Sequence, residues 1–238
     1  MSAELRNNSL INKKVIFEAN AFRRVPIHLG AKIDFLPDGT LLLTSGDGFD
    51  YKEQAQSLNN HFGKIIRLNK DGSVPSDNPF VDIPNALPEI FSYGHRNMQG
   101  LVVMEDGRIF EHEHGPRGGD EFNLIEPGKN YGWPAITYGI DYSGAVISPF
   151  TKMDGMEQPL KYWVPSIAPS DMIYYDGDLY PELKNSFLVT ALKSRDVKKI
   201  KKINSLFSEE SIFSNLKSRL RSIGISPSGE MYLSLIHI

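Results

Sequence analysis

Residues 114–134 combine the features that proteins use to bind hard cations. The segment reads HGPRGGDEFNLIEPGKNYGWP, and its glycines and prolines leave no room for a helix. A Gly-Pro step fixes the backbone so that carbonyl oxygens can face a cation, because proline has no N–H to place there. Asp120 and Glu121 add two carboxylates close by. The pattern predicts calcium-type coordination, and the alternative is a solvated turn whose carboxylates pair with Arg117.

A second set of residues could bind an anion. Arg96 in YGHRNMQGL, Lys193 in LVTALKSRD, and the pair Arg219 and Arg221 in SRLRSIGISPSG sit among small or apolar neighbours. The last two share a face in an extended strand, and guanidinium groups match carboxylate oxygens. We expect the set to converge on one ligand with several negative charges, beside a stacking wall that contains Trp163. The alternative is that each is an isolated surface charge.

His28 is the candidate for proton transfer. It lies in VPIHLGAKIDFLPDG, just before a predicted strand, with small residues on its C-terminal side. An imidazole titrates near neutrality and is the usual base for an alcohol proton, although a lone histidine often has a structural role. His95, His112 and His114 show no spacing typical of a zinc site.

Composition limits the kind of protein that positions these residues. The chain has 238 residues, of which 40% are hydrophobic and 23% charged, which is enough for one substantial domain. A formal net charge of -3 argues against a nucleic-acid partner. There is no cysteine, so any metal is held by oxygen or imidazole. The N-terminal residues are polar and lack the apolar run of a signal peptide or a membrane span.

Strand patterns dominate the chain. Apolar, β-branched runs follow Asp-Gly or Ser-Gly turns at residues 37–48, 63–73, 105–116, 175–192 and 227–234. Turn glycines recur at long, irregular intervals. This pattern favours a β-propeller built of small antiparallel sheets, with a β-sandwich as the alternative.

Two regions are less clear. Residues 208–220 place Ile212, Leu216 and Leu220 on one helical face, but strand and loop compete with a helix there. The end of the chain, LSLIHI from Leu233, is similar to the translation of a sequencing adapter. We therefore assign the domain to residues 1–232, treat 233–238 as a non-native tail, and expect the chain to be a fragment.

Several segments together resemble one family. They are HLGAKIDFLPDGTLLLTSGDG, GKIIRLNKDGSVPSDNPF, IFSYGHRNMQGL, EHGPRGGDEFNLIEPGKNYGWP, WVPSIAPS, LVTALK and RLRSIGISPSG. In this order they resemble the soluble sugar dehydrogenases that depend on pyrroloquinoline quinone (PQQ), the glucose/sorbosone or aldose sugar dehydrogenase family. The resemblance covers residues 14–232 and implies a six-bladed β-propeller, of which this chain would carry about four blades.

The resemblance also implies residue roles. His28 matches the base that takes the proton of the anomeric hydroxyl while hydride passes to PQQ, giving a lactone. The implied PQQ contacts are Arg96, Asn97, Gln99, Trp163, Lys193, Arg219 and Arg221. Calcium bound to the cofactor would be held by the carbonyls of Gly115 and Pro116. A second, structural calcium would be held by Asp120, Glu121 and the Tyr131 carbonyl.

The sequence departs from the family pattern at Met98, where proline is usual, and at SGDG, where a GDR or GDQ turn is usual. The resemblance implies a monomeric enzyme, periplasmic or secreted, that oxidises an aldose and passes electrons to an unidentified acceptor. We expect the fragment alone to be inactive. The alternatives are a non-catalytic binding propeller and a calcium-dependent sugar-lactone hydrolase, which would need a carboxylate-rich channel and no basic clamp.

Overall fold

The computed structural model describes residues 1–204 and 206–236, and within them the regular secondary structure is almost entirely β-strand, joined by long loops. The helical parts of this range are three short 3-10 turns, η1 (Lys52–Gln56), η2 (Pro181–Leu183) and η3 (Ser214–Leu216). None of them has the length and apolar character that a membrane span requires.

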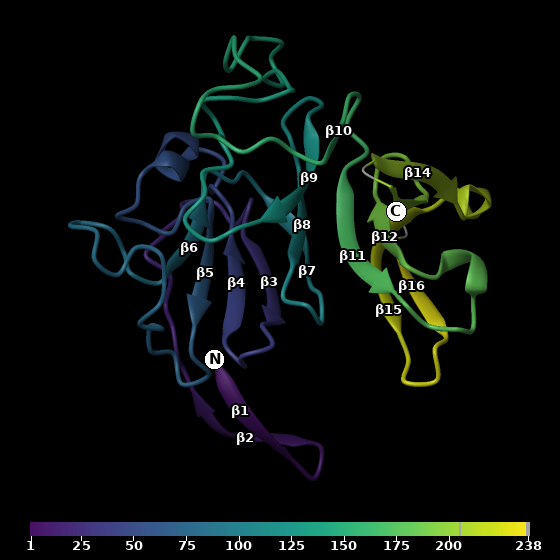
Figure 1. Ribbon diagram of the computed structural model, residues 1–238, viewed down its shortest axis with the longest axis horizontal. Helices are drawn as coiled ribbons and strands as arrows, with labels where there is room; N and C mark the ends of the chain where they lie inside the picture. Colours follow the sequence, from purple (N-terminus) through teal and green to yellow (C-terminus); the bar gives the residue numbers. More distant parts are fainter. Residues whose placement is uncertain (205, 237–238) are drawn as a thin grey trace.

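Three four-stranded antiparallel sheets follow one another along the chain (Figure 1). The first contains β3 (Gly30–Phe35), β4 (Leu41–Ser45), β5 (Lys64–Leu68) and β6 (Ile90–Tyr93). The second contains β7 (Met98–Val103), β8 (Ile109–Glu113), β9 (Asp120–Ile125) and β10 (Lys161–Trp163). The third contains β11 (Pro169–Tyr175), β12 (Ser186–Ala191), β13 (Val197–Ile203) and β14 (Leu206–Ile212). Each strand pairs with the next one in sequence, so every sheet is a simple meander.

Two hairpins flank these sheets. The first joins β1 (Ser2–Arg6) to β2 (Ser9–Lys14), and the last joins β15 (Arg219–Ile225) to β16 (Met231–Ile236). Residues 233–236, assigned to a non-native tail, are the last four of the six residues of β16, and residues 237–238 lie outside the described part of the chain.

The turn signals in the sequence explain most of these strands. Gly39, Gly107 and Gly229 all have positive φ, between 83° and 94°, which a glycine adopts without steric cost. Each heads a strand that the sequence predicts, and these predictions are confirmed. The helical alternative for residues 208–220 is wrong. Most of this stretch is extended, because the apolar residues of β14 and β15 pair in two different sheets and do not share one helical face.

The innermost strands of successive sheets lie side by side, which makes the arrangement a propeller. β3 packs beside β7, β7 beside β11, and β11 beside β15. The Asp34 carboxylate near the end of β3 accepts the Val103 N–H at the end of β7, at 2.7 Å. The strands therefore run in the same direction, and all start at one end of the molecule. The fold is an open arc of three complete blades and a fourth with two strands, as predicted.

The cores lie between neighbouring blades. Leu42, Ile65 and Met98 are fully buried between the first and second sheets. Between the second and third sheets the core is aromatic, and the rings of Phe110 and Phe187 lie 4.5 Å apart. Burying apolar area against the next sheet stabilises a blade that could not fold alone.

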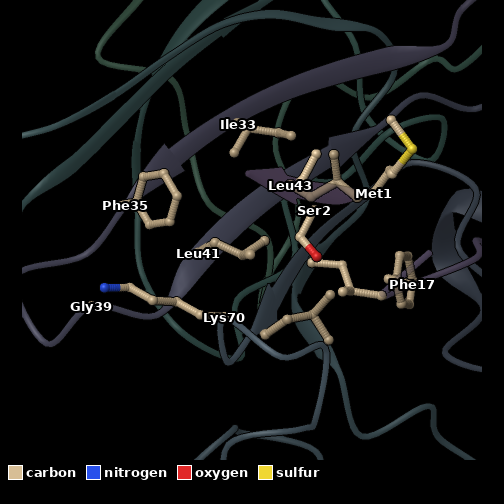
Figure 2. A pocket seen from close by; sticks show the side chains of 12 residues that line it. Met1, Ser2, Phe17, Ile33, Phe35, Gly39, Leu41, Leu43 and Lys70 are labelled. Atoms are coloured by element: carbon tan, nitrogen blue, oxygen red, sulfur yellow. The ribbon is translucent and has the colours of Figure 1, made fainter. Parts of the chain in front are cut away.

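One face of the first sheet is only partly covered. Figure 2 shows an apolar hollow lined by Ile33, Phe35 and Leu41 together with Met1 and Phe17. Ile33 is 59% exposed and Phe35 is 53% exposed. The β1–β2 hairpin and the segment around Phe17 provide the cover that this face has.

Lys64 gives the fold a testable pH dependence. Its side chain is fully buried, and its ammonium group donates to the carbonyls of Gln54, Ala55 and Phe62 at 3.1, 2.9 and 2.5 Å. Burial lowers the pKa of Lys64 to about 7 from its usual 10.5. Between these two pH values the unfolded chain binds more protons than the folded chain, so stability rises with pH.

We therefore expect the wild type to gain stability relative to Lys64→Met as the pH rises above 7, at up to about 1.4 kcal/mol per pH unit. Urea unfolding of both proteins at pH 7.5, 8.5 and 9.5 measures this. A difference between the two proteins that stays constant across the series would contradict the assignment.

Candidate active site

The direction of the strands brings distant residues to one end of the propeller. His28 directly precedes β3, Arg96 and Asn97 precede β7, and Arg219 and Arg221 lie at the start of β15. Because the inner strands are parallel and adjacent, their starting points lie along the same end of the arc. The loops between the second and third strands of each blade return to the same end, and these loops contain Asp47, Gly115 and Lys193.

The His28 imidazole is held by a buried carboxylate. His28 Nδ1 lies 2.7 Å from Asp47 Oδ1, and the His28 side chain is 14% exposed while that of Asp47 is 1% exposed. An ionised carboxylate can only accept, so Nδ1 carries the proton and Nε2 keeps its lone pair. The Asp47 carboxylate also accepts the Phe49 N–H at 2.9 Å and the Trp133 indole N–H at 2.8 Å.

Backbone geometry fixes this pair further. His28 has φ +49° and Phe49 has φ +67°, both in the left-handed region that non-glycine residues rarely adopt. A Cβ on Gly46 would come within 2.2 Å of the His28 carbonyl oxygen, so only glycine lets the two loops approach. The Asp47 N–H donates to the Arg96 carbonyl at 2.7 Å, which joins the first blade to the second.

Arg96 lies beside the same pair. Its Nη1 donates to the carbonyls of His114 and Gly115 at 2.8 and 2.7 Å, and its guanidinium lies 5.2 Å from the centre of the Trp133 ring. Its buried Nε has no acceptor within the described residues. A buried N–H group without an acceptor can donate to a polar atom of a bound ligand.

These groups surround a cleft of about 250 Å³. Its walls are formed by His28, Asp47, Phe49, Arg96, Pro116 and Trp133, and its rim by Asp50, Lys52, Asp141, Tyr142 and Ile147. A basic imidazole, a fixed guanidinium and aromatic rings therefore face one partly enclosed space. Such a space suits an alcohol substrate beside a planar anionic group.

The loop with Gly115 and Pro116 is held tightly by Asp120. One Asp120 oxygen accepts the Gly115 N–H at 3.0 Å. The other accepts from Ser166 Oγ and from two backbone N–H groups of residues 167–168, at 2.7 to 2.9 Å. Three of these four donors share one oxygen, so the other oxygen keeps a free lone pair and the metal role of Asp120 stays a prediction. Its contacts orient the loop that contains Gly115.

Glu121 and Tyr131 line a second, very small hollow of about 10 Å³. Burial, with Glu113 close by, raises the pKa of Glu121 to about 8. Burial also raises the pKa of Glu111 well above its usual range. These acidic groups lie on β8 and β9, next to the loop of Gly115.

Two more of the predicted cofactor residues connect to the site. Gln99 donates to Asn97 at 3.0 Å, and Arg221 Nη1 lies 3.5 Å from the Gln99 side-chain oxygen. Arg221 is 122 positions away from Gln99 in the sequence, and the fold brings the two side chains together. Lys193 lies in the β12–β13 loop, where its N–H donates to the Ile167 carbonyl at 3.0 Å.

Trp163 does not line the cleft. Its ring is buried in the aromatic core between the second and third sheets, and its N–H donates to Glu209 at 2.7 Å. The stacking wall predicted from this residue is therefore not formed by its ring. Trp133 instead contributes the indole that lines the cleft.

Sequence reasoning missed Asp47, Phe49 and Tyr142. Asp47 belongs to SGDG, which reads as a turn and a departure from the family pattern. An aspartate nineteen residues after a candidate base was a usable signal, since general bases are commonly oriented by a carboxylate.

We expect Asp47→Ala to destabilise the protein by about 2–5 kcal/mol, because three donors would lose a buried charged acceptor. Asp50→Ala, at the rim of the same cleft, is the matched control and should change stability by less than about 0.5 kcal/mol. Urea unfolding compares the two. Equal effects would show that Asp47 does not organise the site.

Comparisons with known proteins agree with this arrangement. The family model described as Glucose / Sorbosone dehydrogenase matches residues 1–235. The aldose sugar dehydrogenase YliI of Escherichia coli is 37% identical over 230 residues, which covers 92% of this chain and 62% of that protein. The chain thus spans less than two thirds of that relative.

Solved structures share the fold. A glucose dehydrogenase crystal structure superposes with a TM-score of 0.94 at 39% identity, covering 98% of this chain and 69% of that one. The PQQ-bound aldose sugar dehydrogenase of Streptomyces coelicolor superposes with a TM-score of 0.67 at 29% identity, covering 86% of this chain and 55% of that one. Because the family model matches nearly the whole of this chain, the chain belongs to the glucose/sorbosone dehydrogenase family.

Proposed function

We propose that this chain forms the catalytic end of a PQQ-dependent aldose dehydrogenase, and that His28 is its general base. The observation that carries the proposal is the His28–Asp47 pair in a cleft shared with Arg96. A non-catalytic propeller would have no need to hold an imidazole in one tautomer with two left-handed residues around it.

His28 would act on the anomeric hydroxyl of the sugar. With Nδ1–H bonded to Asp47, the lone pair of Nε2 is the acceptor for the hydroxyl proton, and the buried carboxylate stabilises the imidazolium that forms. Loss of the proton raises electron density on the anomeric carbon, so its hydrogen can leave as hydride and the sugar becomes a lactone. His28 holds the proton until it passes to solvent through the open side of the cleft.

PQQ and calcium fit the residues next to His28. When bound, PQQ accepts the hydride and its calcium polarises the quinone as a Lewis acid. Arg96, with its unpartnered buried Nε, would hold a polar atom of the quinone, and the carbonyls of Gly115 and Pro116 would supply hard oxygen ligands. The Asp120 contacts support this role, because they fix the loop before any ligand binds.

The remaining polar residues would clamp the cofactor carboxylates. Arg221 is linked through Gln99 and Asn97 to Arg96, and Arg219 lies on the same side of β15 two residues away. Lys193 would add a third positive charge from the next loop. We also propose a structural calcium at Asp120, Glu121 and the Tyr131 carbonyl, a periplasmic or secreted location, and a monomer that passes electrons to a separate acceptor.

The test is dye-linked oxidation of glucose and other aldoses by the complete protein, whatever flanks residues 1–238, with PQQ and calcium added. We expect His28→Ala to lower kcat by roughly two to four orders of magnitude while PQQ still binds. Asp47→Asn should also lower kcat, because an amide no longer holds the productive tautomer.

The matched control is His61→Gln, which replaces a histidine that also pairs with a carboxylate, Glu89, but lies outside the cleft. It should retain normal turnover. An unchanged kcat for His28→Ala with weakened PQQ binding would assign His28 a structural role. A wild type that oxidises no aldose with PQQ and calcium would overturn the proposal.

A further inference from the structure

A buried group of three ligand-type side chains lies beneath the cleft. His95, just before β7, faces Glu111 and Glu113 on β8. His95 Nδ1 lies 3.9 Å from Glu111 Oε1 and 3.8 Å from Glu113 Oε1, and all three side chains are at most 4% exposed. One ligand atom from each of them falls within 4.8 Å of the others.

The imidazole points an unpartnered atom into this group. His95 Nε2 is bonded to Ser92 Oγ at 2.9 Å, and the ring stacks on Tyr131 with centres 4.6 Å apart. These contacts fix the ring. Its Nδ1 has no hydrogen-bond partner anywhere in residues 1–204 and 206–236. An imidazole nitrogen that is buried, fixed and unpartnered is typical of a metal ligand.

The carboxylates also keep free oxygens. Glu113 Oε2 accepts the N–H groups of Arg96 and Asn97 at 2.5 and 3.2 Å, which orients the carboxylate. Glu111 Oε1 accepts from Asn123 at 2.8 Å, whereas Glu111 Oε2 has no partner in the described part of the chain. Hydrogen bonds of this kind, from backbone N–H groups and a side-chain amide, commonly orient carboxylates that bind metals.

The charge of the group is not balanced by protein. Among the residues that the structure describes, the ion pairs of lysine and arginine do not include Glu111 or Glu113. Glu121 lies directly across the sheet from Glu113 and adds a third carboxylate. Burying carboxyl groups without a countercharge destabilises the fold, because each must ionise without a partner or stay protonated, and a divalent cation would remove that cost.

We propose that His95, Glu111 and Glu113 bind a divalent transition-metal ion of the zinc or manganese class. One imidazole and two carboxylates form a ligand set that such ions accept, whereas calcium prefers oxygen ligands alone. The donor spacing needs only a small inward movement to reach ligand distances of about 2.0–2.2 Å. The ligand set of this site differs from those proposed for the two calcium ions, although Glu113 lines the same small hollow as Glu121 and Tyr131. The site does not depend on the proposed activity.

The test uses the complete protein, whatever flanks residues 1–238, after dialysis against a chelator. Zinc or manganese chloride is titrated by calorimetry, and bound metal is counted by mass spectrometry after gel filtration. We expect one equivalent of metal, and a melting temperature raised by about 5 °C at a hundredfold excess over Kd. Glu111→Gln and His95→Gln should each weaken binding at least a hundredfold.

Two controls define the ligand set. Glu89→Gln changes a carboxylate that pairs with another buried histidine, His61, and should bind metal like the wild type. Glu121→Gln should retain the metal as well. If Glu121→Gln abolishes binding and Glu111→Gln does not, the proposed ligands are wrong.

A measurement without metal covers the case in which a variant folds poorly. In chelator at neutral pH, Glu111→Gln should melt above the wild type, because the amide keeps the shape and removes the cost of holding a buried carboxyl group protonated. A wild type that binds neither zinc nor manganese overturns the proposal. A Glu111→Gln protein that melts below the metal-free wild type also overturns it.

Discussion

The candidate site depends on one buried carboxylate. Asp47 lies in the loop after β4 and accepts from an imidazole, a backbone N–H and an indole that belong to three separate parts of the chain. Its own N–H donates to Arg96 in the next blade. A single side chain therefore sets the tautomer of His28, the position of Trp133 and the contact between two blades. Removing it would disturb catalytic geometry and stability together.

The propeller fold brings these separate parts of the chain together. Each inner strand starts at the same end, so residues before β3 and β7 and at the start of β15 lie at that end of the molecule, although they are far apart in sequence. The blades supply rigid supports, while the loops at their ends carry the chemistry. Carboxylates such as Asp34 and Asp171 bond backbone N–H groups of the following inner strand and keep neighbouring blades in register.

Much of the architecture could be predicted from the sequence, because turn glycines and alternating apolar residues are local signals. The strands after Gly39, Gly107 and Gly229 were found in this way. Residues 208–220 were ambiguous, since the same apolar spacing suits a helix and two separate strands. Only the pairing of β14 and β15 in different sheets decides between them, and that is a tertiary property.

The site was predictable in part, for a similar reason. His28, Arg96 and the Gly115–Pro116 loop carry distinctive local sequence and come together in the cleft. Asp47 looked like an ordinary turn residue, and the positions of Trp133 and Trp163 relative to the cleft depend on how the sheets pack. Asp120 stays a predicted metal ligand, and its part in holding the Gly115 loop depends on donors from residues 166–168 that only tertiary packing brings to it.

The central claim is that the cleft between His28, Arg96 and Pro116 is where oxidation takes place. The most direct measurement is a crystal structure of the complete protein grown with PQQ and calcium. The account predicts that the quinone lies in this cleft, with its reactive carbonyl facing His28 Nε2 and the cation against the carbonyls of Gly115 and Pro116. A quinone bound at any other place, or a cleft that stays empty at saturating PQQ, would contradict it.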